Sequence, residues 1–212
     1  MCRFRYLDRN EGGPERSMVM SIVILASGGL DSTLSAVLAK EQGLKIHPLF
    51  VDYGQIAKDR ELDACRTVYK QLNLPEPKVV DVNGFGSIYP SGLTNNNMHI
   101  LHDAFLPGRN MLFLLMGATY ACNVCANSIS IGLLTEDLSL FPDQTKKFIE
   151  KAENLISFIT NRELKILAPF MDFTKKDIIT LAKQKGIDGT YSCHAGTEKP
   201  CGECIACKEF DD

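Results

Sequence analysis

The sequence contains no apolar run of the ~18 residues that a membrane-spanning helix needs. Its apolar stretch at residues 18–26 has the length of a short signal-peptide core, but a signal peptide carries positive charge before that core. Here Asp8, Glu11 and Glu15 precede it. We therefore reject a signal peptide and expect a cytoplasmic protein in which residues 1–17 form a poorly ordered N-terminal extension.

The chain also lacks an excess of positive charge. Its 23 lysines and arginines are outnumbered by 26 aspartates and glutamates, and the formal net charge is −3. Proteins that bind DNA or RNA usually present a basic surface, so this balance gives no strong nucleic-acid signal and favours small-molecule chemistry. The 212 residues, 45% of them apolar, are enough for one domain with its own core.

A third absence concerns phosphate binding. Residues 24–36, ILASGGLDSTLSA, place Gly28 and Gly29 between an apolar run and a helix-like run, as a phosphate-binding loop does. The Walker pattern GxxxxGK[ST] requires a lysine after the glycines, and none is present. The loop is therefore not the usual cradle for a γ-phosphate, and a simple strand-to-helix turn is the alternative.

The residues around the two glycines nevertheless suit an anion. Ser27, Ser32 and Thr33 offer hydroxyl donors, and the first N–H groups of the following helix would point at a bound phosphate. Asp31 would repel phosphate directly. It makes sense either as a cap of the helix N-terminus or as a ligand of Mg²⁺ that bridges the phosphates.

The rest of the chain alternates short β-branched runs with longer amphipathic runs, which predicts a doubly wound, parallel, Rossmann-like α/β sheet. The expected strands are residues 21–26, 45–53, 78–82, 128–132 and 164–169. The expected helices include residues 111–126 and 174–185, the second with Thr174 as its N-cap. Ligands of such sheets bind at the carboxyl ends of the strands, so the loops after residues 26, 52 and 132 should line one crevice.

Cysteine is concentrated near the C-terminus. Of the eight cysteines, four follow the pattern C-x7-C-x2-C-x2-C: Cys193, Cys201, Cys204 and Cys207. Such clustering favours metal in a reducing compartment, and four thiolates close a tetrahedral, structural Zn²⁺ site, with an Fe–S cluster or disulfides as alternatives. We expect residues 191–212 to form a zinc knuckle beside a main domain of residues 18–190. Cys122 and Cys125 lie in an apolar run and are interpreted as core residues.

Together these motifs resemble a known family. SGGLDS after a strand resembles the PP-loop of the ATP pyrophosphatase superfamily, and a PP-loop combined with a four-cysteine C-terminus resembles the QueC family of 7-cyano-7-deazaguanine synthases. Further matching segments are DYGQ (52–55) followed by Glu61, SGLT (91–94), LPGRN (106–110), TKKDII (174–179) and SC…EKPCGEC (192–204). The resemblance runs from about residue 21 to residue 207, which is nearly the whole chain.

The resemblance implies an ATP-dependent ligase of queuosine biosynthesis. Such an enzyme adenylates 7-carboxy-7-deazaguanine, uses ammonia to form the nitrile 7-cyano-7-deazaguanine (preQ0), and releases AMP and pyrophosphate. Its PP-loop grips the β- and γ-phosphates as one unit and leaves the α-phosphate open to attack by a substrate oxygen. The implied cofactors are ATP, Mg²⁺ and one structural Zn²⁺, and family members are similar in being homodimers.

Residue roles follow from the same resemblance. The residues implied in catalysis are Asp31, Ser32, Arg109 and Lys175. The residues implied in ATP binding are Ala26, Ser27, Gly28, Gly29, Leu30, Asp31, Ser32, Thr33, Asp52 and Gln55. The residues implied in binding the acid substrate are Arg109, Asp137, Phe141 and Asp143. The alternatives are a surface ion pair for Arg109, a solvated helix start for Lys175, and helix capping for Asp52 and Gln55.

One segment departs from the family. The family pattern after the fourth strand is roughly D-x-S-G-Y-P-D-C-R, whereas residues 137–145 read DLSLFPDQT. The Cys and Arg positions hold Gln144 and Thr145, and His194 stands where the family usually has Tyr. The departure does not affect the residues implied in adenylation, but it leaves the identity of the substrate undecided. A divergent QueC-like ligase, of the kind found in bacterial defence systems, would pass the same or a similar acid to another amine, for example on a protein.

A third hypothesis is a zinc-knuckle binding module whose PP-loop no longer turns over ATP. The intact loop hydroxyls and Asp31 argue against it. Assaying the protein with ATP and the acid, with and without ammonia, separates the three hypotheses.

Overall fold

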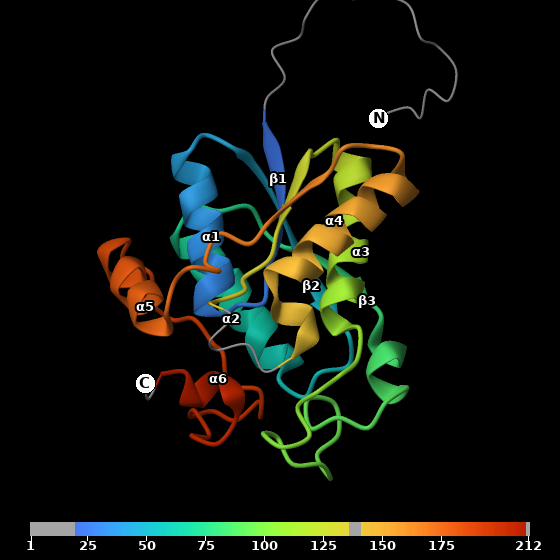
Figure 1. Cartoon of the computed structure of the whole chain (residues 1–212). Coiled ribbons are helices and arrows are strands. Elements are labelled where there is room, and N and C mark those ends of the chain that lie inside the picture. Colours follow the sequence, from blue (N-terminus) through green and yellow to red (C-terminus); the bar gives the residue numbers. More distant parts are fainter. Residues whose placement is uncertain (1–19, 136–140, 211–212) are drawn as a thin grey trace, which may run out of the picture.

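The computed structural model describes residues 20–135 and 141–210. Within them, five strands form one sheet (Figure 1): β1 (Ser21–Leu25), β2 (Lys45–Asp52), β3 (Lys78–Asp81), β4 (Ser128–Ser130) and β5 (Lys165–Leu167). The strand order is β3-β2-β1-β4-β5, and every neighbouring pair is parallel. The predicted fold class is confirmed, and each expected strand is present. The predicted extension at residues 1–17 lies outside the described residues.

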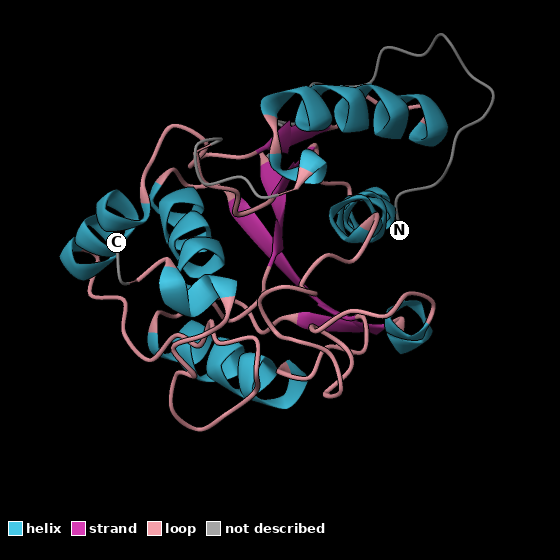
Figure 2. Cartoon of the chain, turned by 60° about the horizontal axis from the view of Figure 1, so that its bottom comes forward, coloured by secondary structure: helices cyan, strands magenta, loops and turns pink. Residues whose placement is uncertain are grey.

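Helices cover both faces of this sheet (Figure 2). They are α1 (Leu30–Glu41), α2 (Lys58–Gln71), α3 (Arg109–Val124), α4 (Lys146–Thr160), α5 (Lys175–Gln184) and the short α6 (Ile205–Lys208), with 3₁₀ turns η1 (Asn83–Ser87) and η3 (Pro142–Gln144). As predicted, Thr174 caps α5, because its hydroxyl oxygen accepts a hydrogen bond from the Asp177 backbone N–H. Among the described helices, none has the length and apolar character that spanning a membrane requires.

Helix α4 is not among the predicted elements, although its sequence carries helix signals. Thr145 caps its N-terminus by accepting a hydrogen bond from the backbone N–H of Phe148 at 3.2 Å, and Ile156 is fully buried on its inner face. Its outer face is unusual for a surface helix, because Phe158 there is 81% exposed.

Two apolar clusters fill the space between the sheet and the helices. On β1, Ile22 and Ile24 belong to the cluster shared with α1, α2 and α5, whereas Val23 and Leu25 belong to the cluster shared with α3 and α4. All four side chains are at most 8% exposed. A strand covered on both faces in this way is typical of parallel sheets.

The strand order fixes where a ligand can bind. From β1 the chain first builds β2 and β3 on one side, and later places β4 and β5 on the other side. The loops that leave the carboxyl ends of β1 and β4 therefore diverge, which opens a crevice between them.

Candidate active site and metal centre

A cavity of about 240 Å³ opens at the carboxyl ends of the strands. Residues that follow β1 (Ala26 and Ser27), β2 (Tyr53) and β4 (Gly132) line it together. The predicted convergence of three loops on one crevice is therefore confirmed. Other walls come from the starts of α2, α3 and α5, from the loop before α3, from η3 and from the cysteine-rich C-terminal segment.

The glycine loop packs closely against α2. Gly28 has a φ of +78°, in the left-handed region, and a Cβ at this position would collide with the carbonyl oxygen of Glu61. Only glycine combines this backbone conformation with this close approach. Gly28, predicted to bind ATP, lies outside the cavity walls and instead lets the loop rest on α2.

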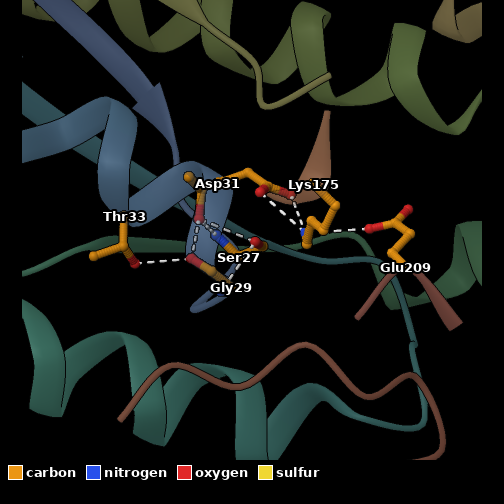
Figure 3. Close-up of polar contacts among 7 residues, drawn as sticks. Ser27, Gly29, Asp31, Thr33, Lys175 and Glu209 are labelled. Carbon is orange, nitrogen blue, oxygen red and sulfur yellow. Dashed lines mark hydrogen bonds and ion pairs between the residues drawn. The ribbon is translucent and has the colours of Figure 1, made fainter. Parts of the chain in front are cut away.

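The loop hydroxyls divide into two groups. Ser27 and Ser32 line the cavity, with their Oγ atoms 3.1 Å apart. Thr33 is fully buried, and its Oγ1 donates to the Gly29 carbonyl oxygen at 2.9 Å (Figure 3). Thr33 stabilises the first turn of α1 and Leu30 belongs to the core, and neither lines the cavity, so their predicted binding of ATP stays a prediction.

Asp31 and Lys175 form an ion pair in the cavity wall (Figure 3). The Lys175 Nζ lies 3.0 and 2.9 Å from the two carboxylate oxygens of Asp31. Gly29 is the N-cap of α1, so Asp31 does not cap the helix, and its role as a ligand of Mg²⁺ stays a prediction. Lys175 is only 4% exposed, which contradicts the alternative of a solvated helix start.

Arg109 begins α3 beside an aromatic pair. Its guanidinium carbon lies 6.0 Å from the ring centres of both Tyr53 and Phe113, whose rings are 5.3 Å apart. Burial raises the pKa of Tyr53, and the nearby Arg109 opposes this only in part, so the phenol stays neutral at pH 7. All three residues line the cavity, which gives it a cation set against a flat aromatic wall.

Gln55 holds the half-buried carboxylate of Glu61 at the cavity wall. Its Nε2 donates to Glu61 Oε2 at 3.1 Å, and its Oε1 accepts a hydrogen bond from the Tyr53 N–H at 2.9 Å. Burial raises the pKa of Glu61 to about 7, against the opposing effects of Gln55 and Arg109. Glu61 belongs to a motif quoted above, but we predicted no role for it, because its burial depends on how the PP-loop packs on α2.

Two predicted site residues serve local structure away from the cavity walls. The Asp52 carboxylate accepts a hydrogen bond from the Gly54 N–H at 3.1 Å and lies 3.7 Å from the Lys58 ammonium. The Asp143 carboxylate accepts a hydrogen bond from the Asn110 N–H at 3.4 Å, and the Asp143 carbonyl accepts one from Asn110 Nδ2 at 2.9 Å. Asp143 thus anchors the start of α3, next to Arg109, and does not line the cavity.

The segment that departs from the family pattern does reach the cavity. Phe141 and Gln144 both line it, and the Phe141 ring lies 5.0 Å from the ring of Phe105. Asp137, predicted to bind substrate, lies outside the described residues. The substitutions relative to the family pattern therefore change the shape and polarity of a cavity wall.

The C-terminal segment forms a wall of the cavity beside the PP-loop. The Tyr191 N–H donates to the Gly28 carbonyl oxygen at 2.9 Å, and His194 lines the cavity. Burial lowers the pKa of His194 to about 4, helped by the charges of Arg109 and Lys175, so the imidazole is neutral at pH 7. The cavity thus has walls on both sides of the predicted domain boundary at residues 190 and 191.

The four cysteines of the C-terminal pattern come together as predicted. Their sulfur atoms all lie within 4.8 Å of one another, and all four thiols are free. A tetrahedral ZnS₄ site with Zn–S bonds of about 2.3 Å has sulfur atoms about 3.8 Å apart, so the cluster fits Zn²⁺. The separation of 3.9 Å between the sulfurs of Cys201 and Cys207 excludes a disulfide between them. The backbone N–H groups of Cys201 and Cys204 point at cluster sulfurs, which stabilises thiolates.

The second CxxC pair, Cys122 and Cys125, agrees with our interpretation as core residues only in part. Cys122 is half-buried and packs against the core cluster of α3 and α4. Cys125 is exposed and takes a left-handed conformation where α3 ends. The interpretation as a core residue is therefore wrong for Cys125, because the helix ends one residue before it.

Comparison with known proteins gives the same family along nearly the whole chain. The family model described as "Queuosine biosynthesis protein QueC" matches residues 21–211. A 7-cyano-7-deazaguanine synthase of Nitratiruptor sp. is 34% identical over 201 residues, covering 89% of this chain and 91% of the relative. A protein of the same name from Oceanobacillus iheyensis is 34% identical over 198 residues, covering 88% of this chain and 89% of the relative.

Solved structures share the fold at lower sequence identity. A predicted subunit of tRNA methyltransferase from Methanocaldococcus jannaschii superposes with a TM-score of 0.54 and 20% identity, over 77% of this chain and 76% of that chain. An NMN synthetase from Francisella tularensis also gives 0.54, with 14% identity, over 85% of this chain and 69% of that chain. At these identities the likeness concerns the fold alone.

Proposed function

The chain belongs to the QueC family, and on that premise we propose that it is an ATP-dependent carbon–nitrogen ligase. It adenylates 7-carboxy-7-deazaguanine and uses ammonia to form 7-cyano-7-deazaguanine, releasing AMP and pyrophosphate. The proposal is supported above all by one observation: the PP-loop, the Asp31–Lys175 pair and Arg109 face a single cavity. It is also supported by the names of the two relatives, whose alignments cover about nine-tenths of this chain.

At one end of the cavity, the loop suits the β- and γ-phosphates of ATP. The N-terminus of α1 and the hydroxyls of Ser27 and Ser32 offer hydrogen-bond donors and a positive dipole. Lys175 would balance the charge that develops on the departing pyrophosphate. Asp31 would hold Mg²⁺, a cation that prefers oxygen ligands and that neutralises phosphate charge when bound.

At the other end, Arg109 and the aromatic wall suit a flat, acidic substrate. The guanidinium pairs well with a carboxylate, and Tyr53, Phe113 and Phe141 offer surfaces for a planar ring. Holding the acid next to the α-phosphate accounts for much of the catalysis, because no nucleophilic side chain is needed.

The proposed reaction proceeds by two adenylations. A carboxylate oxygen of the acid attacks the α-phosphorus, and the bond to pyrophosphate breaks. The lone pair of ammonia then attacks the acyl carbon, the carbon–oxygen bond to AMP breaks, and the nitrogen loses a proton to give the amide. Adenylation of the amide oxygen by a second ATP, followed by loss of AMP and of the remaining N–H protons, gives the nitrile.

A second candidate function keeps the adenylation but changes the acceptor. Phe141 and Gln144 line the cavity where the family pattern has Tyr and Cys, and His194 lines it where the family usually has Tyr. These differences favour a QueC-like ligase that passes the activated acid to another amine, such as one on a protein.

One assay tests both candidates. The protein is incubated with Mg²⁺, ATP and 7-carboxy-7-deazaguanine, with and without ammonia, and the products are identified by mass spectrometry. The nitrile is expected only with ammonia. An adenylated acid or an amide that never becomes the nitrile contradicts the first candidate and favours the second. Absence of AMP and pyrophosphate under every condition rejects both.

Two further proposals concern the assembly and the metal. We propose a cytoplasmic homodimer, as the resemblance to the family implies, and light scattering that gives the mass of one 23.5 kDa chain would contradict it.

We also propose Zn²⁺ as the metal of the cysteine cluster. Elemental analysis should find one zinc per chain, and iron in its place would support the alternative of a cluster.

A further inference from the structure

The Lys175 ammonium contacts two further residues besides Asp31 of the PP-loop. Its ammonium lies 2.9 Å from the nearer oxygen of Asp31 and 3.2 Å from Glu209 Oε2 (Figure 3). It also lies 4.9 Å from the ring centre of Phe210. Burying an ammonium group is costly unless it is paired, and Lys175 at 4% exposure depends on these contacts.

The two carboxylates reach Lys175 from opposite ends of the chain. Asp31 lies in the first turn of α1, whereas Glu209 directly follows α6, two residues after Cys207. The Glu209 N–H donates to the Ile205 carbonyl oxygen at 3.1 Å. The position of Glu209 therefore depends on the turn that carries the cysteine cluster.

Under the proposed function, Asp31 would bind Mg²⁺ and also pair with the Lys175 ammonium. If Asp31 binds Mg²⁺, most of its attraction for the Lys175 ammonium is lost, because the cation takes over its charge. A lysine side chain is long and flexible, so without a second partner Lys175 would leave its place beside the loop. Glu209 offers that second partner without lying on the loop itself.

We propose that Glu209 is a positioning residue that keeps Lys175 beside the PP-loop while Asp31 binds Mg²⁺. The inference rests on the proposed function and adds a residue to it. It also gives the cysteine cluster a second effect: by fixing the turn before Glu209, a metal at the cluster fixes the ammonium that faces the phosphates.

The test compares Glu209→Ala and Glu209→Gln with the wild type and with Glu203→Ala. Glu203 lies between Cys201 and Cys204, is exposed, and its removal takes away the same charge from the same segment. We expect Glu209→Ala to keep its metal but to lower kcat for pyrophosphate release about 10- to 100-fold with a smaller change in the KM for ATP. Glu209→Gln keeps an oxygen that can accept from Lys175 but removes the charge that pairs with it, so it should show a smaller loss of kcat that is still measurable.

A second readout follows Lys175 without turnover. Its reactivity towards an amine-acylating reagent is measured by peptide mass spectrometry, with Mg²⁺ and a non-hydrolysable ATP analogue present. Reactivity should rise in Glu209→Ala and stay at the wild-type level in Glu203→Ala. If the wild type releases no pyrophosphate, the proposed function fails, and this readout still decides the position of Lys175.

Three results would overturn the inference. The first is a Glu209→Ala variant that matches Glu203→Ala in both kcat and Lys175 reactivity. The second is faster ATP turnover in Glu209→Ala, which would mean that Glu209 blocks the phosphates. The third concerns the case in which Glu209→Ala loses its metal or fails to fold. In that case, a Glu209→Gln variant with the kcat and the Lys175 reactivity of the wild type would overturn the inference.

Discussion

At the phosphate end of the cavity, side chains are bound to one another before any ligand arrives, whereas the acid end is lined by rings. Ser27 and Ser32 are in hydrogen-bond contact, and Lys175 lies between two carboxylates. At the acid end, Arg109 faces the rings of Tyr53 and Phe113. If the proposed function holds, the phosphate end meets a charge pattern that every adenylation shares. The acid end is a surface whose shape depends on which rings line it.

The largest effect should come from removing a ligand of the Zn²⁺ that we propose for the cysteine cluster. Cys204→Ser should lose the bound zinc and destabilise the C-terminal segment, because the folding energy of a small metal site is largely metal-binding energy. Metal analysis and thermal unfolding measure this, with Cys122→Ser as a control outside the cluster. A Cys204→Ser protein with full zinc content would contradict the assignment of the four ligands.

Asp31→Ala should disable the phosphate end while leaving the fold intact. Loss of a preorganised electrostatic group at a reacting centre lowers the rate about 10²- to 10³-fold, so AMP release should fall at least that far. Asp172→Ala, which removes an exposed carboxylate that pairs with Lys146, is the matched control. Substantial AMP release by Asp31→Ala, at an unchanged melting temperature, would exclude the role we give to Asp31.

Arg109→Ala should affect the acid end selectively. We expect kcat/KM for the acid to fall about 10- to 100-fold, because an Arg–carboxylate contact is lost, while the affinity for ATP changes little. Titrating each substrate at saturating concentrations of the other separates the two ends. An equal loss for ATP and for the acid would mean that Arg109 also serves the phosphates, and the contrast between the two ends would fail at this residue.

The smallest effect concerns Glu61, which lies between the two ends. Its pKa is about 7 in the folded protein against an ordinary value of 4.5, so the folded state binds more protons between these values. The free energy of unfolding should therefore fall as pH rises from about 4.5 to about 7, by about 1–3 kcal/mol. Urea unfolding across this range should show the decrease in the wild type and a weaker one in Glu61→Gln. Equal slopes in both proteins would show that Glu61 is not the group that titrates.

Local patterns were sufficient for the strands, the PP-loop and the cysteine cluster. Each depends on neighbours in sequence: a β-branched run, two glycines before a helix, or two CxxC spacings. Local patterns could not show how residues are placed when their neighbours come from elsewhere in the chain. Asp143 anchors the start of α3 through Asn110, and Glu209 reaches the site through its ion pair with Lys175, 34 residues earlier in the chain. Helix α4 is an exception, because its cap and its apolar spacing were readable in the sequence.

The sequence by itself determined the chemistry that is available: a loop with serine hydroxyls and an aspartate, four thiols at ligand spacing, and a segment that departs from the family pattern. The tertiary structure alone decided which of these groups meet. It placed the Thr33 and Asp52 side chains in local hydrogen bonds, Glu61 beside Gln55, and Lys175 between Asp31 and Glu209. The reason is physical: hydrogen-bonding groups are set by residue type, but the burial and charge around each of them come from segments that only the folded sheet brings together.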